Sequence, residues 1–122
     1  MKNIVYVPSN TAAESVAFYV GELGLFELSE DLGMGSILLR YVRSSDFYLM
    51  LAPEVAVSAS GIPIFSIGVE DCDQDFLRLK EISFSNGAGI LGSSGVFEYP
   101  LGKFFTLRDP AGNVFSLYEW YI

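Results

Sequence analysis

The feature that most constrains the fold is a weak internal repeat of one pattern, a strand and a helix followed by three strands. In the first half, residues 2–7 predict a β-branched strand that ends at Pro8. Apolar residues at helical spacing follow between Thr11, which begins a capping-box pattern, and Gly24, a helix stop signal. Three strand-like segments come next, FELSE, SILLRYV and FYLMLA. This order predicts a βαβββ module over residues 1–53.

The second half restarts the same pattern after residues 54–62, which have no clear period and predict a linker. PIFSIGV predicts a strand, and Asp71 or Asp73 is placed to cap a helix. The loop SNGAGILGSSG has room for a short strand, and VFEYP, KFFTLR and NVFSLYEWYI predict three more. We therefore expect one domain over residues 1–122, of the α+β class, with a second βαβββ module over residues 63–122.

The charge and cysteine content narrow the classes of partner. The formal net charge of −8 would repel phosphate backbones, so we expect no nucleic acid partner, whereas a cationic small molecule would be attracted. Cys72 is the single cysteine, which excludes an intrachain disulfide. The N-terminal segment MKNIVYVPSN has the features of neither a signal peptide nor a membrane span. We expect a cytoplasmic protein without a membrane partner.

Several catalytic and cofactor sites are excluded by residue type. The chain has no histidine, which removes imidazole metal ligands and the usual base of Ser-His and Cys-His schemes. Residues 71–75 resemble the start of an EF-hand, but Phe76 and Ile82 stand where that loop needs Gly and Glu. The GxGxxG of residues 87–92 follows a predicted helix and opens none, so it predicts a loop rather than a dinucleotide site. Cys72 is predicted to be a buried core thiol, and no catalytic residue is assigned.

The motifs in both halves resemble a known superfamily. Residues 109–112, DPAG, have the residues that a type I turn favours, and a strand with alternating aromatic residues follows. The stretch KFFTLRDPAGNVFSLYEW, the stretch SVAFYVGELGLFEL and the start of the second module, IFSIGVEDCD, together resemble the vicinal oxygen chelate superfamily. That group includes glyoxalase I, extradiol dioxygenases and bleomycin-resistance proteins. The resemblance implies two paired βαβββ modules whose sheets curl around a cavity.

The resemblance also locates the positions where the superfamily's enzymes hold a divalent metal, one in the first and one in the last strand of each module. Counting from the matched motifs gives Ile4, Leu49, Ile64 and Ser116. Aliphatic side chains cannot bind a metal, and a lone serine hydroxyl is a poor ligand. We therefore expect neither a metal nor another cofactor.

Strand alternation predicts what lines the cavity instead. If Ser116 faces it, so do Val114, Tyr118 and Trp120, while Phe115 and Leu117 face the helices. The same rule places Ile4, Phe47, Leu51 and Gly68 on the cavity side. The predicted ligand-binding residues are Tyr6, Phe47, Leu49, Ile64, Ser66, Ser116, Tyr118 and Trp120. A filled core or a subunit interface would also produce such an apolar face, so those interpretations stay open at this point.

The leading hypothesis is a metal-free, homodimeric binding protein of the glyoxalase/bleomycin-resistance type. It would sequester a hydrophobic or aromatic compound, such as an antibiotic or a metabolite, and the acidic charge suits a cationic one. One alternative is a divergent enzyme of the glyoxalase (lactoylglutathione lyase) or dioxygenase type that uses non-standard ligands. Another is a non-catalytic interaction or scaffold protein.

Overall fold

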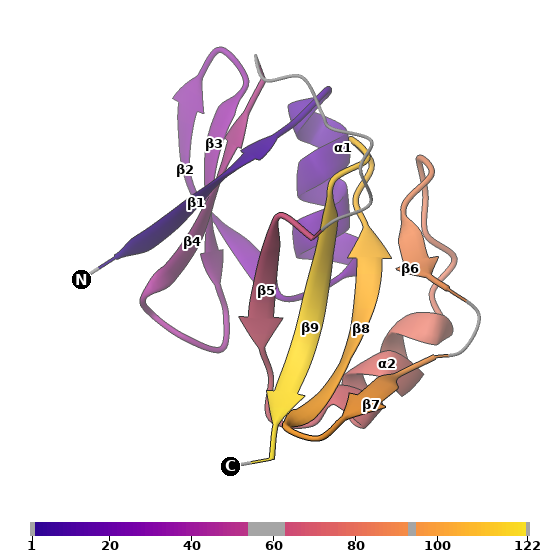
Figure 1. The fold of residues 1–122 in the computed structure, drawn as a ribbon. Coiled ribbons are helices and arrows are strands. Elements are labelled where there is room, and N and C mark those ends of the chain that lie inside the picture. Colours follow the sequence, from indigo (N-terminus) through magenta and orange to yellow (C-terminus); the bar gives the residue numbers. More distant parts are fainter. Residues whose placement is uncertain (1, 54–62, 93–94, 122) are drawn as a thin grey trace.

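The computed structural model describes residues 2–53, 63–92 and 95–121 (Figure 1). The predicted linker, residues 54–62, lies outside the described residues. The elements of the first half are β1 (Asn3–Pro8), α1 (Ala12–Val16), the π-helical segment η1 (Ala17–Glu22), β2 (Phe26–Gly33), β3 (Ser36–Tyr41) and β4 (Phe47–Ala52). Those of the second half are β5 (Phe65–Gly68), α2 (Cys72–Lys80), β6 (Gly89–Leu91), β7 (Phe97–Tyr99), β8 (Gly102–Arg108) and β9 (Val114–Trp120).

Each half forms its own mixed sheet with the same connectivity. The strand order is β1-β4-β3-β2 in the first sheet and β5-β9-β8-β6 in the second. In each sheet the first strand of the module runs parallel to the last, and the remaining pairs are antiparallel. Both β6 and β7 pair with β8, so they act as two pieces of one interrupted edge strand. The predicted α+β class and the predicted order of elements are confirmed.

The two helical segments start where the sequence predicts. Asp71 caps α2, since its Oδ1 accepts a 2.9 Å hydrogen bond from the Gln74 N–H. Thr11 occupies the cap position of α1, but its side chain makes no capping hydrogen bond. The first helix then widens into η1 and stops before Gly24, whose φ of 71° lies in the left-handed region that ends helices.

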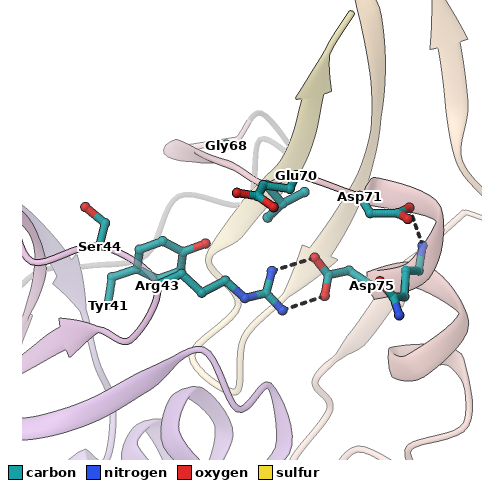
Figure 2. A pocket seen from close by; sticks show the side chains of 9 residues that line it. Tyr41, Arg43, Ser44, Gly68, Glu70, Asp71 and Asp75 are labelled. Carbon is teal, nitrogen blue, oxygen red and sulfur yellow. Dashed lines mark hydrogen bonds and ion pairs between the residues drawn. The ribbon is translucent and has the colours of Figure 1, made fainter.

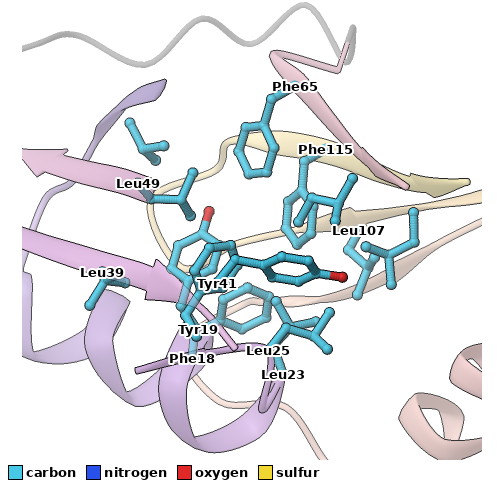
Figure 3. Close-up of a cluster of buried hydrophobic side chains, with 14 of the residues drawn as sticks. Phe18, Tyr19, Leu23, Leu25, Leu39, Tyr41, Leu49, Phe65, Leu107 and Phe115 are labelled. Carbon is cyan, nitrogen blue, oxygen red and sulfur yellow. The ribbon is translucent and has the colours of Figure 1, made fainter. Parts of the chain in front are cut away.

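The core lies between the two sheets, around the first helical segment (Figures 1 and 3). Phe18 and Tyr19 of η1 are fully buried and lie 6.0 and 5.8 Å, ring centre to ring centre, from Phe115 of β9. Phe115 stacks on Phe65 of β5 at 5.0 Å. One aromatic cluster thus joins both modules, and it occupies the face of each sheet that the helical segments cover.

The register of the first sheet corrects one prediction. Parallel pairing places Ile4 beside Tyr48, so these two side chains share a face, and Leu49 lies on the opposite one. Leu49 and Leu51 have no exposed surface and belong to the core cluster, and Phe47 packs against it. The count back from Pro53 was therefore off by one residue, and a shift of one reverses the face of every side chain in a strand.

Candidate ligand-binding site

The outer face of the second sheet, which points away from the core, carries a shallow pocket of about 320 Å³. Three adjacent strands and the neighbouring edge segment supply its lining, which consists of Ser66, Tyr99, Phe104, Ser116, Tyr118 and Trp120. Strand alternation explains the choice of residues, since Phe115 and Leu117 of the same strand β9 have no exposed surface and face the core. The pocket is therefore built on a rigid sheet rather than on loops.

Hydroxyl groups form the floor of this pocket. Ser116 stands beside Ser66 of β5 on one side and beside Thr106 of β8 on the other. The Ser116 and Thr106 hydroxyls are 3.3 Å apart, close enough for a hydrogen bond. Ser116 is buried, whereas Ser66 is exposed. The three side chains form a short polar row across the strands, and Ser66 and Ser116, the two that line the pocket, could orient a ligand by hydrogen bonds.

Aromatic rings form the walls. Tyr118 and Trp120 meet edge to face at 6.0 Å, and Tyr99 meets Phe104 in a similar way at 5.8 Å. Trp120 is 49% exposed, so much of its indole surface is free. A Cβ added at Gly68 would lie 3.1 Å from the Tyr118 hydroxyl. Any other residue at this position would therefore require the Tyr118 ring to shift. The walls offer flat apolar surfaces suited to stacking against a planar ligand.

The arrangement of the two sheets matches that of known structures. No model of a protein family matches the sequence, and no curated protein does either. The structure of UcmS2 superposes with a TM-score of 0.76 at 21% identity, over 97% of this chain and 96% of that one. TnmS3, an antibiotic binding protein from Streptomyces sp. CB03234, superposes with a TM-score of 0.75 at 23% identity, over 98% and 95% of the two chains.

A third solved structure adds a slightly higher identity. It is a glyoxalase/bleomycin resistance protein from the same Streptomyces strain, with a TM-score of 0.71 at 26% identity over 96% of this chain and 98% of that one. This chain has the glyoxalase/bleomycin-resistance fold. The resemblance and the fold predicted from the sequence are therefore confirmed, and the two sheets are curled but do not close into a barrel.

The metal site of the superfamily's enzymes does not fit the residues of this chain. The pocket around Ser116 offers hydroxyls and aromatic rings, and the described residues contain no cluster of three His, Cys, Asp or Glu side chains. Glu119 points to the opposite face, as alternation predicts, where its Oε1 accepts a 2.8 Å hydrogen bond from the Cys72 N–H. Asp109 is 1% exposed and held within its turn. The side chains around Ser116 therefore do not supply the ligands that a divalent metal needs.

Cys72 is unsuited to nucleophilic chemistry. The thiol is buried against β9, with its sulfur 3.7 Å from the Leu117 carbonyl oxygen. Burial, reinforced by the negative charges of Asp73 and Glu119, raises the pKa of this thiol to about 12. The thiolate is the reactive form, so the prediction of an unreactive core cysteine is supported by its surroundings.

Of the eight predicted ligand-binding residues, four come together in one pocket and the other four lie elsewhere. Ser66, Ser116, Tyr118 and Trp120 come together in the pocket of the second sheet. Phe47 lines a separate cavity of about 240 Å³ that also touches Ser66, and Leu49 is buried in the core. Tyr6 and Ile64 are 67% and 45% exposed and line none of these cavities. A ligand-binding role for any of these residues remains a prediction.

Two lining residues were not singled out from the sequence. Phe104 is the cross-strand neighbour of Tyr118, and Tyr99 belongs to the short edge strand β7. Extending the alternation from β9 to KFFTLR would have placed Phe104 on the Ser116 side. Tyr99 gave no such signal, because the pairing of β7 with β8 was not predicted.

In the described part of the chain, no helix is long and apolar enough to cross a membrane.

Proposed function

We propose that this protein binds a hydrophobic or aromatic small molecule on the outer face of its second sheet and holds it without changing it chemically. The carrying observation is the pocket itself, in which the hydroxyls of Ser66 and Ser116 lie beside the aromatic rings of Tyr118 and Trp120. Such a lining supplies stacking area and orienting hydrogen bonds. Among the described residues, the lining includes no carboxylate, thiolate or imidazole that could act as base or nucleophile.

The net charge supports a ligand that carries a positive charge. The chain has 15 acidic and 7 basic residues and no histidine, so its overall field attracts cations. Similarity to an antibiotic binding protein supports a drug or a metabolite as the class of ligand.

We propose further that two copies form each complete binding cleft. The pocket is open on one side, and the outer face of the first sheet is also uncovered, with Ile4 41% and Tyr6 67% exposed. Placing that face of one copy over the second sheet of another would bury both apolar surfaces. A dimer with two such clefts follows from this pairing. Sedimentation at micromolar concentration should then give a dimer, and the substitution Tyr6→Glu should shift it toward monomer.

The binding proposal is tested by a thermal-shift screen of planar aromatic compounds in cationic and neutral pairs. We expect hits to raise the melting temperature, and mass spectrometry after prolonged incubation to recover them unaltered. Tyr118→Ala should weaken binding about tenfold, because one stacked ring is lost. Leu77→Ala, at a 54% exposed residue of α2, is the matched control and should bind normally. A stoichiometric product, or equal binding by Tyr118→Ala, would refute the proposal.

A further inference from the structure

The aromatic pocket around Ser116 adjoins a smaller cavity of about 240 Å³, the side cavity, which lies where the start of β4 meets β5. The lining of the side cavity consists of Tyr41, Ser44, Phe47, Ser66, Ile67 and Gly68. Ser66 also lines the aromatic pocket, whereas the other five residues do not. Because Ser66 is small and exposed, the pocket and the side cavity meet across a side chain that closes neither of them.

The lining of the side cavity is largely apolar. The half-buried ring of Phe47 lies 6.0 Å, centre to centre, from the ring of Tyr41, so the aromatic core holds it in place. Tyr41 and Ile67 are only 5% and 3% exposed, so each offers little surface to a ligand. Ser44 and Ser66 add hydroxyl groups, and none of the described lining residues is charged. This chemistry suits a slender, uncharged chain.

The Tyr118 ring leans over Gly68 and leaves the neighbouring Ser66 exposed. A Cβ built on Gly68 would lie 3.1 Å from the Tyr118 hydroxyl oxygen and 3.2 Å from Cζ, so the end of the ring rests directly over the glycine. The φ of Gly68 lies outside the left-handed region, so the backbone itself does not require glycine here. Glycine weakens a strand, and the close approach of Tyr118 explains its presence in β5. Ser66, two residues earlier on the same face, stays uncovered.

Beyond Gly68 the side cavity adjoins a larger one, of about 600 Å³, at the junction of the two modules (Figure 2). Tyr41, Ser44 and Gly68 line both cavities. Figure 2 shows Arg43 and Asp75 facing each other there, and the guanidinium group donates 2.8 Å hydrogen bonds to both carboxylate oxygens. A chain longer than the side cavity would therefore emerge beside an ion pair whose charges are already matched.

We propose that the side cavity is a second subsite for the ligand of the aromatic pocket, and that this ligand is a planar aromatic compound with a slender, uncharged side chain. The inference rests on the proposed function, because it assigns one part of the same ligand to each place. The aromatic part stacks on Tyr118 and Trp120, and the side chain crosses Ser66 to lie against Phe47. Two residues of a strand span about 7 Å, and the volume of about 240 Å³ holds roughly eight water-sized groups, so a chain of about six atoms fits.

Two acridines test this subsite. 9-Aminoacridine and 9-(hexylamino)acridine have the same rings and the same positive charge at neutral pH, and they differ by one six-carbon chain. We expect titration calorimetry to show at least about tenfold tighter binding of the hexyl compound, because several methylene groups leave water. In that complex, NOESY spectra should show contacts between the terminal methyl group and the ring protons of Phe47.

The outcomes separate this inference from the proposed function. Equal affinity of the two acridines, or a terminal methyl group that contacts Trp120 and Tyr99 but not Phe47, would overturn the second subsite and leave binding at the aromatic pocket intact. Failure of both compounds to bind would overturn the proposed function together with the subsite.

Two substitutions at Ser66 make the test specific, and both should fold because this side chain is exposed. Ser66→Leu adds bulk where the chain crosses, so the preference for the hexyl compound should fall to about twofold or less. Ser66→Ala removes the hydroxyl without adding bulk and should keep a preference of at least about tenfold. Each preference is a ratio within one variant, so an effect on the acridine rings alone cancels. A full preference retained by Ser66→Leu would show that the chain takes another path and would contradict the proposal.

Discussion

The Tyr19 hydroxyl donates a 2.7 Å hydrogen bond to Oδ2 of Asp109, which lies 90 residues away in the sequence. The bond joins the first helical segment to the turn that precedes β9, and so links the two modules at the base of the pocket strand. Asp109 also accepts hydrogen bonds from the backbone N–H groups of Ala111 and Asn113, at 3.0 and 2.8 Å. The Asn113 side chain completes the cluster by donating to Asp109 and to the Pro8 carbonyl.

Removing the Tyr19 hydroxyl should destabilise the protein. Both residues are at least 99% buried, so Tyr19→Phe leaves Asp109 Oδ2 with one donor fewer and no access to water. We expect the free energy of unfolding in urea to fall by about 1–3 kcal/mol. The matched control is Tyr121→Phe, which removes a hydroxyl bound to Glu98 at the surface and should change little. Equal effects of the two substitutions would contradict the structural role given to Tyr19.

The stability should depend on pH through Asp109. Burial raises the pKa of this carboxyl, although the hydrogen bonds from Asn113, Tyr19 and Ala111 oppose the rise. In the unfolded state the pKa of this carboxyl is about 3.9. The folded state therefore keeps the proton up to a higher pH than the unfolded state does. The contribution of Asp109 to stability must decrease as pH rises from that value through the folded pKa, and stay constant above it.

The variant Asp109→Asn isolates this contribution, because it removes the titrating group. The measurement is the difference in unfolding free energy between the native protein and the variant, determined across acidic and neutral pH. We expect this difference to become less favourable to the native protein as pH rises, and to level off at neutral pH. A difference that moved in the native protein's favour over the same range would show a pKa lowered by the hydrogen bonds.

The ion pair between Arg43 and Asp75 should contribute more to stability than the one between Arg40 and Glu27. Asp75 is nearly buried and bound at two points, whereas the second pair lies at the surface. Arg43→Met would leave a buried carboxylate whose one remaining ion-pair partner among the described residues is Arg78, at 3.6 Å. We expect a loss of about 2–3 kcal/mol, less than for a fully buried pair because Arg43 is partly exposed. Arg40→Met is the control, and denaturant unfolding should show little change.

Cys72 should resist alkylation in the folded protein. Its thiol is buried and its pKa is raised to about 12, so the reactive thiolate is scarce even at mildly alkaline pH. We expect iodoacetamide to modify the chain only after denaturation, as followed by intact-mass spectrometry. Rapid modification of the native protein, at a rate similar to that of the unfolded chain, would be inconsistent with this environment.

Much of the fold could be predicted because its signals are local. Pro8, Asp71 and the turn beginning at Asp109 mark element boundaries, and alternation in β9 correctly separated Ser116 from Phe115. The face of β4 was predicted wrongly, since the segment FYLMLA is apolar at every position and gives no alternation. Only the pairing of Ile4 with Tyr48 settles which side chains share a face.

The contacts between the two modules could not be predicted from the sequence. Nothing in the neighbourhood of Tyr19 indicates a partner at Asp109, and Arg43 gives no sign of its pairing with Asp75 across the junction. The cavity beside Tyr41 arises from the same packing of one module on the other. Such features depend on tertiary arrangement, whereas periodicity and turn residues report on single elements.

The central claim, ligand binding at the aromatic pocket, is tested most directly by the fluorescence of Trp120, the single tryptophan of the chain. Its indole is 49% exposed and forms a wall of the pocket, so a stacked aromatic ligand must change its emission. For compounds that stabilise the protein, we predict saturable quenching with a midpoint that agrees with the thermal shift and weakens in Tyr118→Ala. Stabilisation without any change in Trp120 emission would place the ligand elsewhere and contradict the account.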